Sequence, residues 1–231
     1  MNGPIDLYVG FDSREEIGYH AFVSSVLHHT TTPVRITTLG PEPLRNVWRW
    51  GSQDGSNSFT YSRFLVPYLN EFKNWAIFCD GSDMLVRADM SELWMLRDYT
   101  KAVLVVPHEY KTRHPRKYVG TLMEWDNRDY PRKNWSSVML INCAHHVWRD
   151  LLPNVVAKLD GSFLHGFDFM QDKHIGHLPF EWNHLVDEYG ANDAAKLLHW
   201  TAGIPAWPHY TNAPMADEWA RAALQVTHAT L

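Results

Sequence analysis

The sequence has 231 residues, of which 45% are hydrophobic and 20% charged, and its formal net charge at pH 7 is -5. This is the composition of a globular protein that can bury a sizeable core, and one domain covering 1–231 is expected. The net negative charge offers no basic face for nucleic acid, so a nucleic-acid partner is not expected.

Two features bear on the cellular compartment. Cys79 and Cys143 both follow apolar runs, which favours buried free thiols in a reducing compartment over a disulfide. No apolar stretch approaches the length that spans a bilayer, and the N-terminus has no basic region followed by a long apolar core. A soluble cytoplasmic protein without a transmembrane segment is the expectation.

The first third of the chain alternates strand and helix patterns. Residues 5–11 predict a strand with Asp12 just beyond it, and Ser13 followed by Glu16 has the spacing of a helix capping box. Residues 17–27 then carry a helical apolar face. A second strand is predicted at 34–39, an irregular Pro-rich stretch at 40–57, and a helix at 58–72 that Pro67 interrupts or bends.

The run 75–79 is continuously apolar and ends in two carboxylates. Such a run predicts a strand buried on both faces of a parallel sheet, and in open α/β sheets ligands bind beyond the carboxyl ends of the strands. Asp80 and Asp83 flank a Gly-Ser turn there, and their oxygens could converge on one hard divalent cation. The alternative is a surface turn in which the aspartates cap backbone amides.

The remaining elements follow the same alternation. Strands are predicted at 102–107, 138–142 and 196–200, and helices at 88–96, 147–159 and 217–226, whereas 175–178 is too short to assign. The pattern dissolves at 108–133, the most basic part of the chain. This segment would suit a polyanionic ligand such as a diphosphate, or it is a solvated loop; its basic residues are Lys111, Arg113, Arg116, Lys117, Arg132 and Lys133.

Two further residues have open interpretations at this stage. Arg63 lies in the predicted helix before the 75–79 strand, from which it could reach the carboxylates or point to solvent. His199 falls near the end of the predicted 196–200 strand and could complete a metal site with Asp80 and Asp83, since imidazole is another common manganese ligand. As one of 14 histidines it could equally be a core or surface residue.

Six blocks together carry a family resemblance. The blocks are IDLYVGFDSRE, FTYSRFLVPYL, FCDGSDMLVRADMSELW, PRKNWSSVMLIN, LPFEWNHL and KLLHWTAGIPAW. In order and spacing they resemble the GT-A-fold glycosyltransferases related to glycosyltransferase family eight, which includes glycogenin-like and lipopolysaccharide galactosyltransferase-like enzymes. The resemblance covers the chain from Ile5 to about Trp207.

The resemblance implies a fold and an activity. The fold is a single Rossmann-like α/β GT-A domain with a mostly parallel central sheet and helices on both faces. The activity is transfer of a hexose from a nucleotide sugar, usually UDP-linked, to a glycan or another hydroxyl acceptor, with retention of anomeric configuration. Mn²⁺ or Mg²⁺ on the diphosphate is the implied cofactor.

The resemblance also assigns residues to the donor site. By position in the family motifs, the nucleoside and diphosphate contacts are Gly10, Phe11, Asp12, Arg63, Asp80, Gly203 and Trp207, and the metal ligands are Asp80, Asp83 and His199. The chain has D-G-S-D where the family has D-x-D, so either Asp80 or Ser82 is the first ligand. The family's N-[AS]-G-V motif becomes W-S-S-V at 135–138.

The catalytic assignment departs furthest from the family. The D-Q-D block is matched to Met170, Gln171 and Asp172, which leaves the front-face sugar contact to Gln171 and no firm nucleophilic carboxylate. Asp172 and Asp168 are the other catalytic candidates. Five residues have two possible roles each. They contact the sugar or the acceptor, or they serve as helix caps or core aromatics: Asp168, Asp172, Glu181, Trp182 and Asn183.

Two other function classes remain open from the sequence. A metal-dependent nucleotidyltransferase would share the sheet, the acidic turn and the cation, but should show a Gly-rich or basic signature after the first strand, and Gly10-Phe11-Asp12 does not provide one. A non-catalytic module that binds nucleotide sugars or carbohydrate is the third class, because the motif departures could mark lost activity.

Overall fold

The computed structural model describes residues 3–48 and 55–227. The predicted irregular stretch 40–57 therefore lies partly outside the described residues. The strands are β1 (Ile5–Gly10), β2 (Val34–Leu39), β3 (Trp75–Cys79), β4 (Met84–Val86), β5 (Val103–Val105), β6 (Arg116–Lys117), β7 (Trp125–Asp126), β8 (Val138–Asn142), β9 (Ile175–His177), β10 (His184–Leu185) and β11 (Leu197–His199).

Short helices connect most of these strands. The α-helices are α1 (Glu16–His29), α2 (Pro41–Leu44), α3 (Val66–Leu69), α4 (Met90–Met95), α5 (Pro153–Val156), α6 (Gly161–His165), α7 (Val186–Tyr189) and α8 (Ala216–Thr227). Single 3₁₀ turns are η1 (Ser13–Glu15), η2 (Ser62–Leu65), η3 (Trp135–Ser137), η4 (His146–Trp148), η5 (Asp172–His174), η6 (Phe180–Trp182) and η7 (Pro208–Tyr210).

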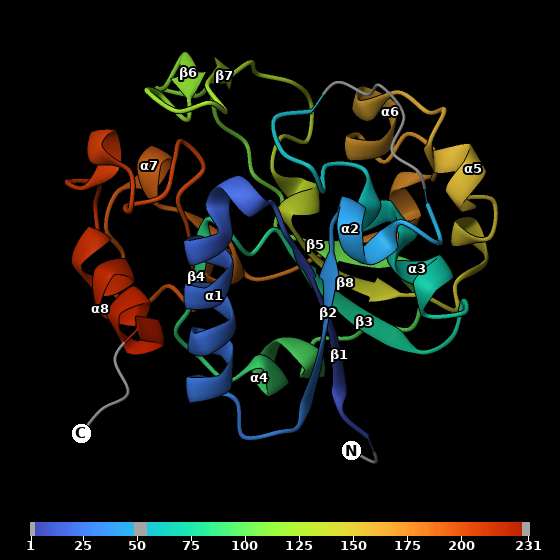
Figure 1. The fold of residues 1–231 in the computed structure, drawn as a ribbon. Coiled ribbons are helices and arrows are strands. Elements are labelled where there is room, and N and C mark those ends of the chain that lie inside the picture. The colour runs from blue at the N-terminus through green and yellow to red at the C-terminus, as the bar shows by residue number, and fades with distance from the viewer. Residues whose placement is uncertain (1–2, 49–54, 228–231) are drawn as a thin grey trace.

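A six-stranded sheet in the order β2-β1-β3-β8-β5-β9 forms the centre of the molecule (Figure 1). β8 runs antiparallel to both of its neighbours, and the other three pairings are parallel, so five strands point the same way. β3 is buried along its whole length, as its apolar run predicts. The mostly parallel α/β sheet predicted from the sequence is confirmed.

Helices pack on both faces of this sheet. Alternate strand residues such as Ile77 and Phe78 point to opposite faces, which is the two-residue period of a strand. Phe22 of α1 and Leu93 of α4 belong to the core on the Ile77 side. Leu44, Val66, Val156 and Leu164, from α2, α3, α5 and α6, belong to the core on the Phe78 side. The predicted cover of helices on both faces is also confirmed.

A second, three-stranded sheet lies beside the first, in the order β10-β11-β4. Sequence patterns indicated only β11 of these strands, because β4 and β10 are too short to show a period. β4 begins one residue after Asp83, and its antiparallel pairing with β11 places Met84 opposite His199. This sheet therefore joins two segments that are far apart in the sequence.

Two helix predictions were wrong in extent, for the same physical reason. The segment 58–72 is not one bent helix but a turn, the 3₁₀ turn η2 and the short α3, in which Pro67 stands in the first turn. Likewise α5 starts at Pro153 instead of continuing from residue 147. Proline lacks an N–H and fits the first turn of a helix, so each of these prolines lies in the first turn of a short helix instead of inside a longer one.

The predicted capping box was also wrong. The carboxylate of Asp12, not the hydroxyl of Ser13, accepts a hydrogen bond from the backbone N–H of Arg14 (3.0 Å) and caps η1. The longer α1 starts behind it without a side-chain cap. The helices predicted at 88–96 and 217–226 are present, since α4 lies within the first range and α8 covers the second. Among the described helices, none combines the length and apolar character that a membrane span requires.

Candidate active site

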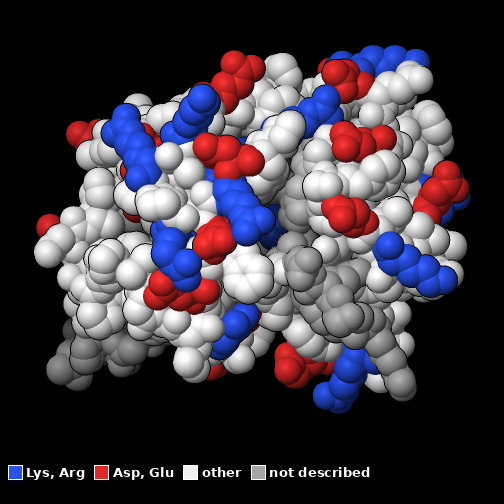
Figure 2. Space-filling view, turned by 90° about the horizontal axis from the view of Figure 1, so that it is seen from above, with Lys and Arg blue, Asp and Glu red and all other residues white. Residues whose placement is uncertain are grey.

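A cavity of about 970 Å³ opens at the edge of the sheet where β1 and β3 end. Figure 2 looks down on this face, which is hollowed near its middle and ringed by interspersed acidic and basic side chains. The lining comes from the turn after β3, from η2, η3 and α6, and from the segment 116–134, together with His199 and Thr201. A cavity of this size holds a drug-sized ligand.

Asp80 and Asp83 reach this cavity from the turn after β3. Gly81 has a φ of +83°, a left-handed conformation that favours glycine. The backbone N–H of Asp80 donates to the carbonyl of Ser137 at 2.9 Å, and that of Met84 donates to Gly81 at 3.0 Å. The turn is therefore anchored to η3 on one side and runs directly into β4 on the other.

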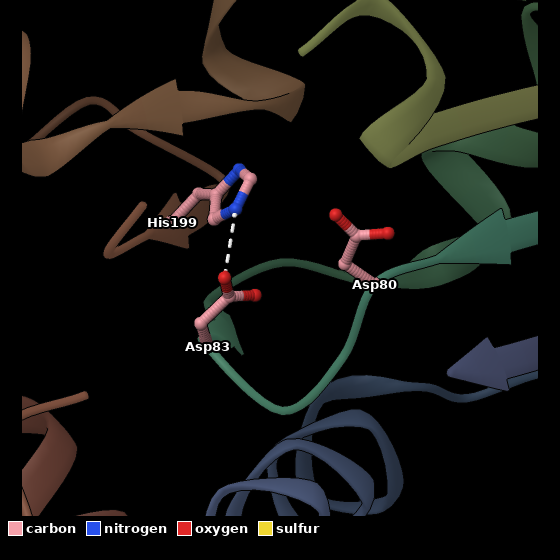
Figure 3. Close-up of side chains that lie close together, drawn as sticks. All are labelled: Asp80, Asp83 and His199. Atoms are coloured by element: carbon pink, nitrogen blue, oxygen red, sulfur yellow. Dashed lines mark hydrogen bonds and ion pairs between the residues drawn. The ribbon is translucent and has the colours of Figure 1, made fainter. Parts of the chain in front are cut away.

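His199 faces the two carboxylates from β11 (Figure 3). Its Nε2 lies 3.3 Å from Oδ2 of Asp83, and ligand atoms of Asp80, Asp83 and His199 all lie within 4.8 Å of one another. The backbone N–H of Trp200 also donates to the carbonyl of Asp83, at 2.8 Å. The structure thus brings together the three residues that the family resemblance assigns to the metal.

Asn183 holds the imidazole of His199 from behind. Its Oδ1 is 2.9 Å from Nδ1 of His199, and its Nδ2 donates to Oγ of Ser137 at 2.9 Å. A proton on Nδ1 satisfies this contact and leaves Nε2 free to bind a metal, as is usual for histidine ligands. Asn183 is fully buried, so its predicted contact with sugar or acceptor is replaced by this supporting role. Trp182 likewise lies in the core.

Arg63 is buried beside Asp80 and does not point to solvent. Its guanidinium forms an ion pair with Asp80 (2.5 Å) and donates to the carbonyls of Ser136 (3.0 Å) and Thr60 (2.9 Å). It thereby ties the metal corner to η2 and η3. A guanidinium suits this position because it presents several donors in one plane.

Burial and neighbouring charges shift the protonation of this group. Burial raises the pKa of Asp80 to about 6, although Arg63 opposes the shift. Burial disfavours the charged form of His199, but Asp83 outweighs it and raises the pKa of the imidazole. A buried carboxyl group and an imidazole with shifted pKa values in one cavity, here Asp80 and His199, are typical of a functional site.

The donor set fits a divalent cation. Two carboxylates and one imidazole match the oxygen and nitrogen ligands of manganese, and carboxylates match magnesium. Oδ1 of Asp83 is buried and has no hydrogen-bond partner within the described part of the chain, so it has an unused lone pair. Ser82 is fully buried and is not part of the cavity lining, whereas Asp80 and Asp83 are. The geometry therefore favours Asp80 and Asp83, rather than Ser82, as the metal ligands of this turn.

Two charged residues near this group were not singled out individually from the sequence. Glu15 is buried, and burial together with Asp83 raises the pKa of its carboxyl well above the usual range. Lys117 lines the cavity and donates to Oγ of Ser56 at 2.7 Å; burial lowers its pKa to about 8, against the pull of Asp83 and Glu15. Only the general basic character of 108–133 pointed to Lys117.

The residues assigned to the nucleoside lie at the end of β1. A side chain at Gly10 would come within 2.7 Å of the carbonyl of Asp80, so glycine allows β1 and β3 to end side by side. Phe11 packs edge-on against Tyr19. Asp12 is buried and accepts from Arg14 (2.6 Å) and from the backbone of Ser58 (2.9 Å). Their contact with a nucleoside stays a prediction.

Gly203 and Trp207 support the cavity wall from outside the lining. Gly203 is buried against the ring of Tyr210, whose hydroxyl accepts from the backbone N–H of Val119 at 2.8 Å. Trp207 packs edge-on against Tyr118, a lining residue, with ring centres 5.5 Å apart. Both residues buttress the segment that carries Lys117, and their contact with a diphosphate stays a prediction.

The structure does not bring the three catalytic candidates to the metal corner. Asp168, Gln171 and Asp172 are exposed and lie outside the cavity lining, and Asp172 pairs with Arg132 at 2.6 Å. The cavity is lined instead by α6 and its cap, namely Asp160, Gly161, Ser162 and His165. The sequence signal that could have indicated this segment is the acidic residue Asp160, which lies ten residues before Met170.

The basic segment is largely neutralised by its own acidic residues. Arg116 forms ion pairs with Glu124 (2.7 Å) and Asp126 (3.0 Å), and Lys133 forms one with Asp129 (3.5 Å). Arg116, Lys117 and Lys133 line the cavity, and Lys111, Arg113 and Arg132 do not. Of the six basic residues considered for a polyanionic ligand, only Arg116, Lys117 and Lys133 are therefore placed to contact a ligand in the cavity.

Comparisons with known proteins agree with this architecture. No family model matches the chain. Protein CDI of Arabidopsis thaliana is 36% identical over 224 residues, which covers 94% of this chain and 85% of that protein.

Cys79 and Cys143 are free and buried in the structure, as the sequence predicted.

Several solved structures share the fold at low sequence identity. The bifunctional glycosyltransferase WbbM has a TM-score of 0.66 and 13% identity over 98% of this chain, which spans 52% of that protein. GlyE of Streptococcus pneumoniae has a TM-score of 0.63 and 14% identity over 96% of this chain, which spans 61% of GlyE.

The galactosyltransferase LgtC, solved with donor and acceptor sugar analogues, has a TM-score of 0.60 and 13% identity, and 98% of each chain is covered. WbbM and GlyE are thus considerably longer than this protein, whereas LgtC matches it end to end. This protein therefore belongs to the family of Protein CDI and has a GT-A fold related to that of glycosyltransferase family eight.

Proposed function

We propose that this protein is a metal-dependent glycosyltransferase that moves a hexose from a UDP-sugar to a hydroxyl group of a glycan or another acceptor. The observation that carries the proposal is the convergence of Asp80, Asp83 and His199 at a cavity of about 970 Å³. The fold shared with WbbM, GlyE and LgtC supports it. We include in the proposal that residues 1–231 act as one domain.

Asp80, Asp83 and Nε2 of His199 would hold Mn²⁺ or Mg²⁺. The bound cation would stabilise the negative charge that develops on the departing diphosphate. Lys117 lines the same cavity and adds a positive charge that the protein itself provides. Arg63 stays committed to Asp80 and keeps that carboxylate in place, while Asn183 fixes the imidazole of His199.

We further propose that transfer retains the anomeric configuration through attack on the front face of the sugar. The bond between C1 and the diphosphate oxygen breaks with its electron pair going to the diphosphate, and the acceptor oxygen bonds to C1. The proton of the acceptor hydroxyl moves to the departing phosphate oxygen. Catalytic roles for Gln171, Asp168 and Asp172 remain part of the prediction, and alanine variants with full activity would remove them.

A cytoplasmic location is part of the same proposal. It is supported by the two buried free thiols, which persist in a reducing compartment. UDP-sugars as donors, rather than other nucleotide sugars, are supported by the resemblance of the sequence blocks to family eight.

The proposal is tested by UDP release from a panel of UDP-hexoses with Mn²⁺, with and without candidate acceptors. We expect release that stops when the metal is chelated. The Asp83→Asn variant should bind UDP with Mn²⁺ more weakly by about 10–100-fold or more, because a ligand is lost. Asp150→Asn, at an exposed carboxylate outside the cavity, is the matched control and should behave like the wild type.

The other two function classes appear as distinct outcomes. Formation of a nucleotide sugar from a nucleoside triphosphate and a sugar phosphate would replace the proposal with a nucleotidyltransferase. Metal-dependent binding of UDP-hexoses without release or transfer would indicate a binding module. Unchanged UDP affinity in the folded Asp83→Asn protein would overturn the metal assignment.

A further inference from the structure

A serine and a histidine are paired on the cavity wall, next to the metal corner but outside it. Oγ of Ser136 lies 2.7 Å from Nδ1 of His165, and both residues line the cavity. Ser136 is buried, and its carbonyl accepts from Arg63, the partner of Asp80. The proposed mechanism uses neither residue of this pair.

The imidazole of His165 is held in a fixed orientation. Its ring packs edge-on against Phe64 with centroids 5.2 Å apart, and Ser136 engages Nδ1. In the described part of the chain, no hydrogen bond to Nε2 is found, so this nitrogen remains for a ligand in the cavity. Whichever way the proton lies in the Ser136 contact, Nε2 offers one donor or one acceptor.

The charge state of His165 limits what it can recognise. Burial, together with the nearby charges of Arg63 and Lys117, holds the pKa of this imidazole well below its usual range. A neutral imidazole flanked by two cations is a poor anchor for a phosphate, which binds best to charged donors. It is a suitable partner for a hydroxyl group, which both donates and accepts.

The topology of the sheet indicates which part of the donor lies here. β1 and β8 flank β3 on opposite sides, and Asp80 and Asp83 follow β3. In a nucleotide sugar the diphosphate links the nucleoside to the sugar. A diphosphate at the metal corner with its nucleoside over the end of β1 directs the sugar toward β8, where Ser136 and His165 stand.

We propose that His165, positioned by Ser136, hydrogen-bonds a hydroxyl group of the transferred hexose and thereby helps to determine which hexose the protein accepts. This inference rests on the proposed function. A site built to hydrogen-bond a hydroxyl rejects a substrate that lacks it or presents it in another direction, because the buried polar group is then left unpaired. His165 is therefore a specificity-determining residue, and Ser136 is a positioning residue.

The test is calorimetric and does not require turnover. The affinities of UDP, UDP-glucose and UDP-galactose are measured with Mn²⁺ for the wild type, His165→Asn and His165→Gln. Asparagine can keep the contact with Ser136 but not the reach of Nε2, whereas glutamine places an amide near the Nε2 position. His20→Asn, at an exposed histidine of α1, is the control.

We expect His165→Asn to bind UDP like the wild type but to lose about fivefold to tenfold in affinity for the preferred UDP-hexose. His165→Gln should recover part of that loss. The ratio of kcat/KM between the two donors, measured by UDP release, should fall by a similar factor in His165→Asn.

Other outcomes separate this inference from the proposed function. Equal losses for UDP and both UDP-hexoses would show that His165 only supports the fold, and unchanged binding would show that it does not touch the sugar. Either result overturns the inference while leaving the proposed function standing. A wild type that binds neither UDP nor any UDP-hexose overturns the proposed function and this inference with it.

Discussion

At the residue scale, the metal corner is a set of buried charges held by specific partners. Arg63 offsets Asp80, and His199 offsets Asp83, although 116 residues separate the last two in sequence. Asp80, Asp83 and His199 could be predicted from the family blocks, because the order of the motifs along the chain can be seen in the sequence without any knowledge of spatial contacts. The role of Asn183 could not be predicted, since nothing in the sequence tells whether an amide points into a cavity or toward a histidine.

Removal of the amide behind His199 should weaken metal binding. In Asn183→Ala the imidazole loses its orienting partner, and we expect Mn²⁺ affinity to fall by about 10–100-fold. Asn183→Asp keeps an acceptor for Nδ1 and should bind Mn²⁺ more tightly than the alanine variant. Titration followed by the electron paramagnetic resonance signal of free Mn²⁺ measures both. Equal affinity in Asn183→Ala and the wild type would mean that Asn183 does not orient His199 for metal binding.

At the scale of elements, the site depends on α1 packing against the turn after β3. A side chain at Gly18 of α1 would overlap the backbone carbonyl of Ser82, so the helix can come this close only with glycine there. The sequence predicted the long helices and the buried strands because these have clear periods. It could not predict β4 and β10, which form only because β11 is available to pair with them.

The Gly18→Ala variant tests this contact. Alanine gains about 1 kcal/mol of helix propensity over glycine, but overpacking costs about 1–3 kcal/mol, and a backbone carbonyl cannot rotate away as a side chain can. We therefore expect a net loss of up to about 2 kcal/mol in the free energy of unfolding, measured with urea, and weaker Mn²⁺ binding. Gly3→Ala is the control, because nothing lies within 4 Å of a side chain there. A more stable Gly18→Ala protein would contradict the contact.

At the scale of the whole molecule, the order of the sequence blocks was enough to predict the fold. The residues of the cavity wall were harder to predict, because many of them lie in loops. The segment 160–172 shows this limit. Its acidic residues repeat at short intervals, so Met170, Gln171 and Asp172 were matched to the family's D-Q-D block while the structure lines the cavity with Asp160 and His165. Register within a loop is set by tertiary packing and has no periodic signal.

Acid should destabilise the molecule through His108. Burial lowers the pKa of this imidazole to about 3 in the folded protein. Below about pH 6.5 the imidazole of His108 therefore takes up a proton in the unfolded chain but stays neutral in the folded protein. The contribution of His108 to stability is therefore intact at pH 7 and is lost as the pH falls. Asp187, whose pKa burial raises to about 6, acts in the opposite direction, so the test must isolate His108.

The comparison is between the wild type and His108→Phe, which retains a ring against Tyr189 and Phe180. Relative to this variant, the wild type should lose about 2 kcal/mol of unfolding free energy between pH 7 and pH 5. Urea unfolding at the two pH values measures the difference. A difference that does not change with pH would show that His108 is protonated in the folded protein.

The most direct test of the central claim is a crystal structure with UDP and Mn²⁺, in which the anomalous signal locates the metal. We expect one Mn²⁺ ion bound to carboxylate oxygens of Asp80 and Asp83 and to Nε2 of His199, within about 2.0–2.6 Å, with the diphosphate of UDP on its open side. A metal ion bound elsewhere, or UDP bound away from Asp80, Asp83 and His199, would contradict the account.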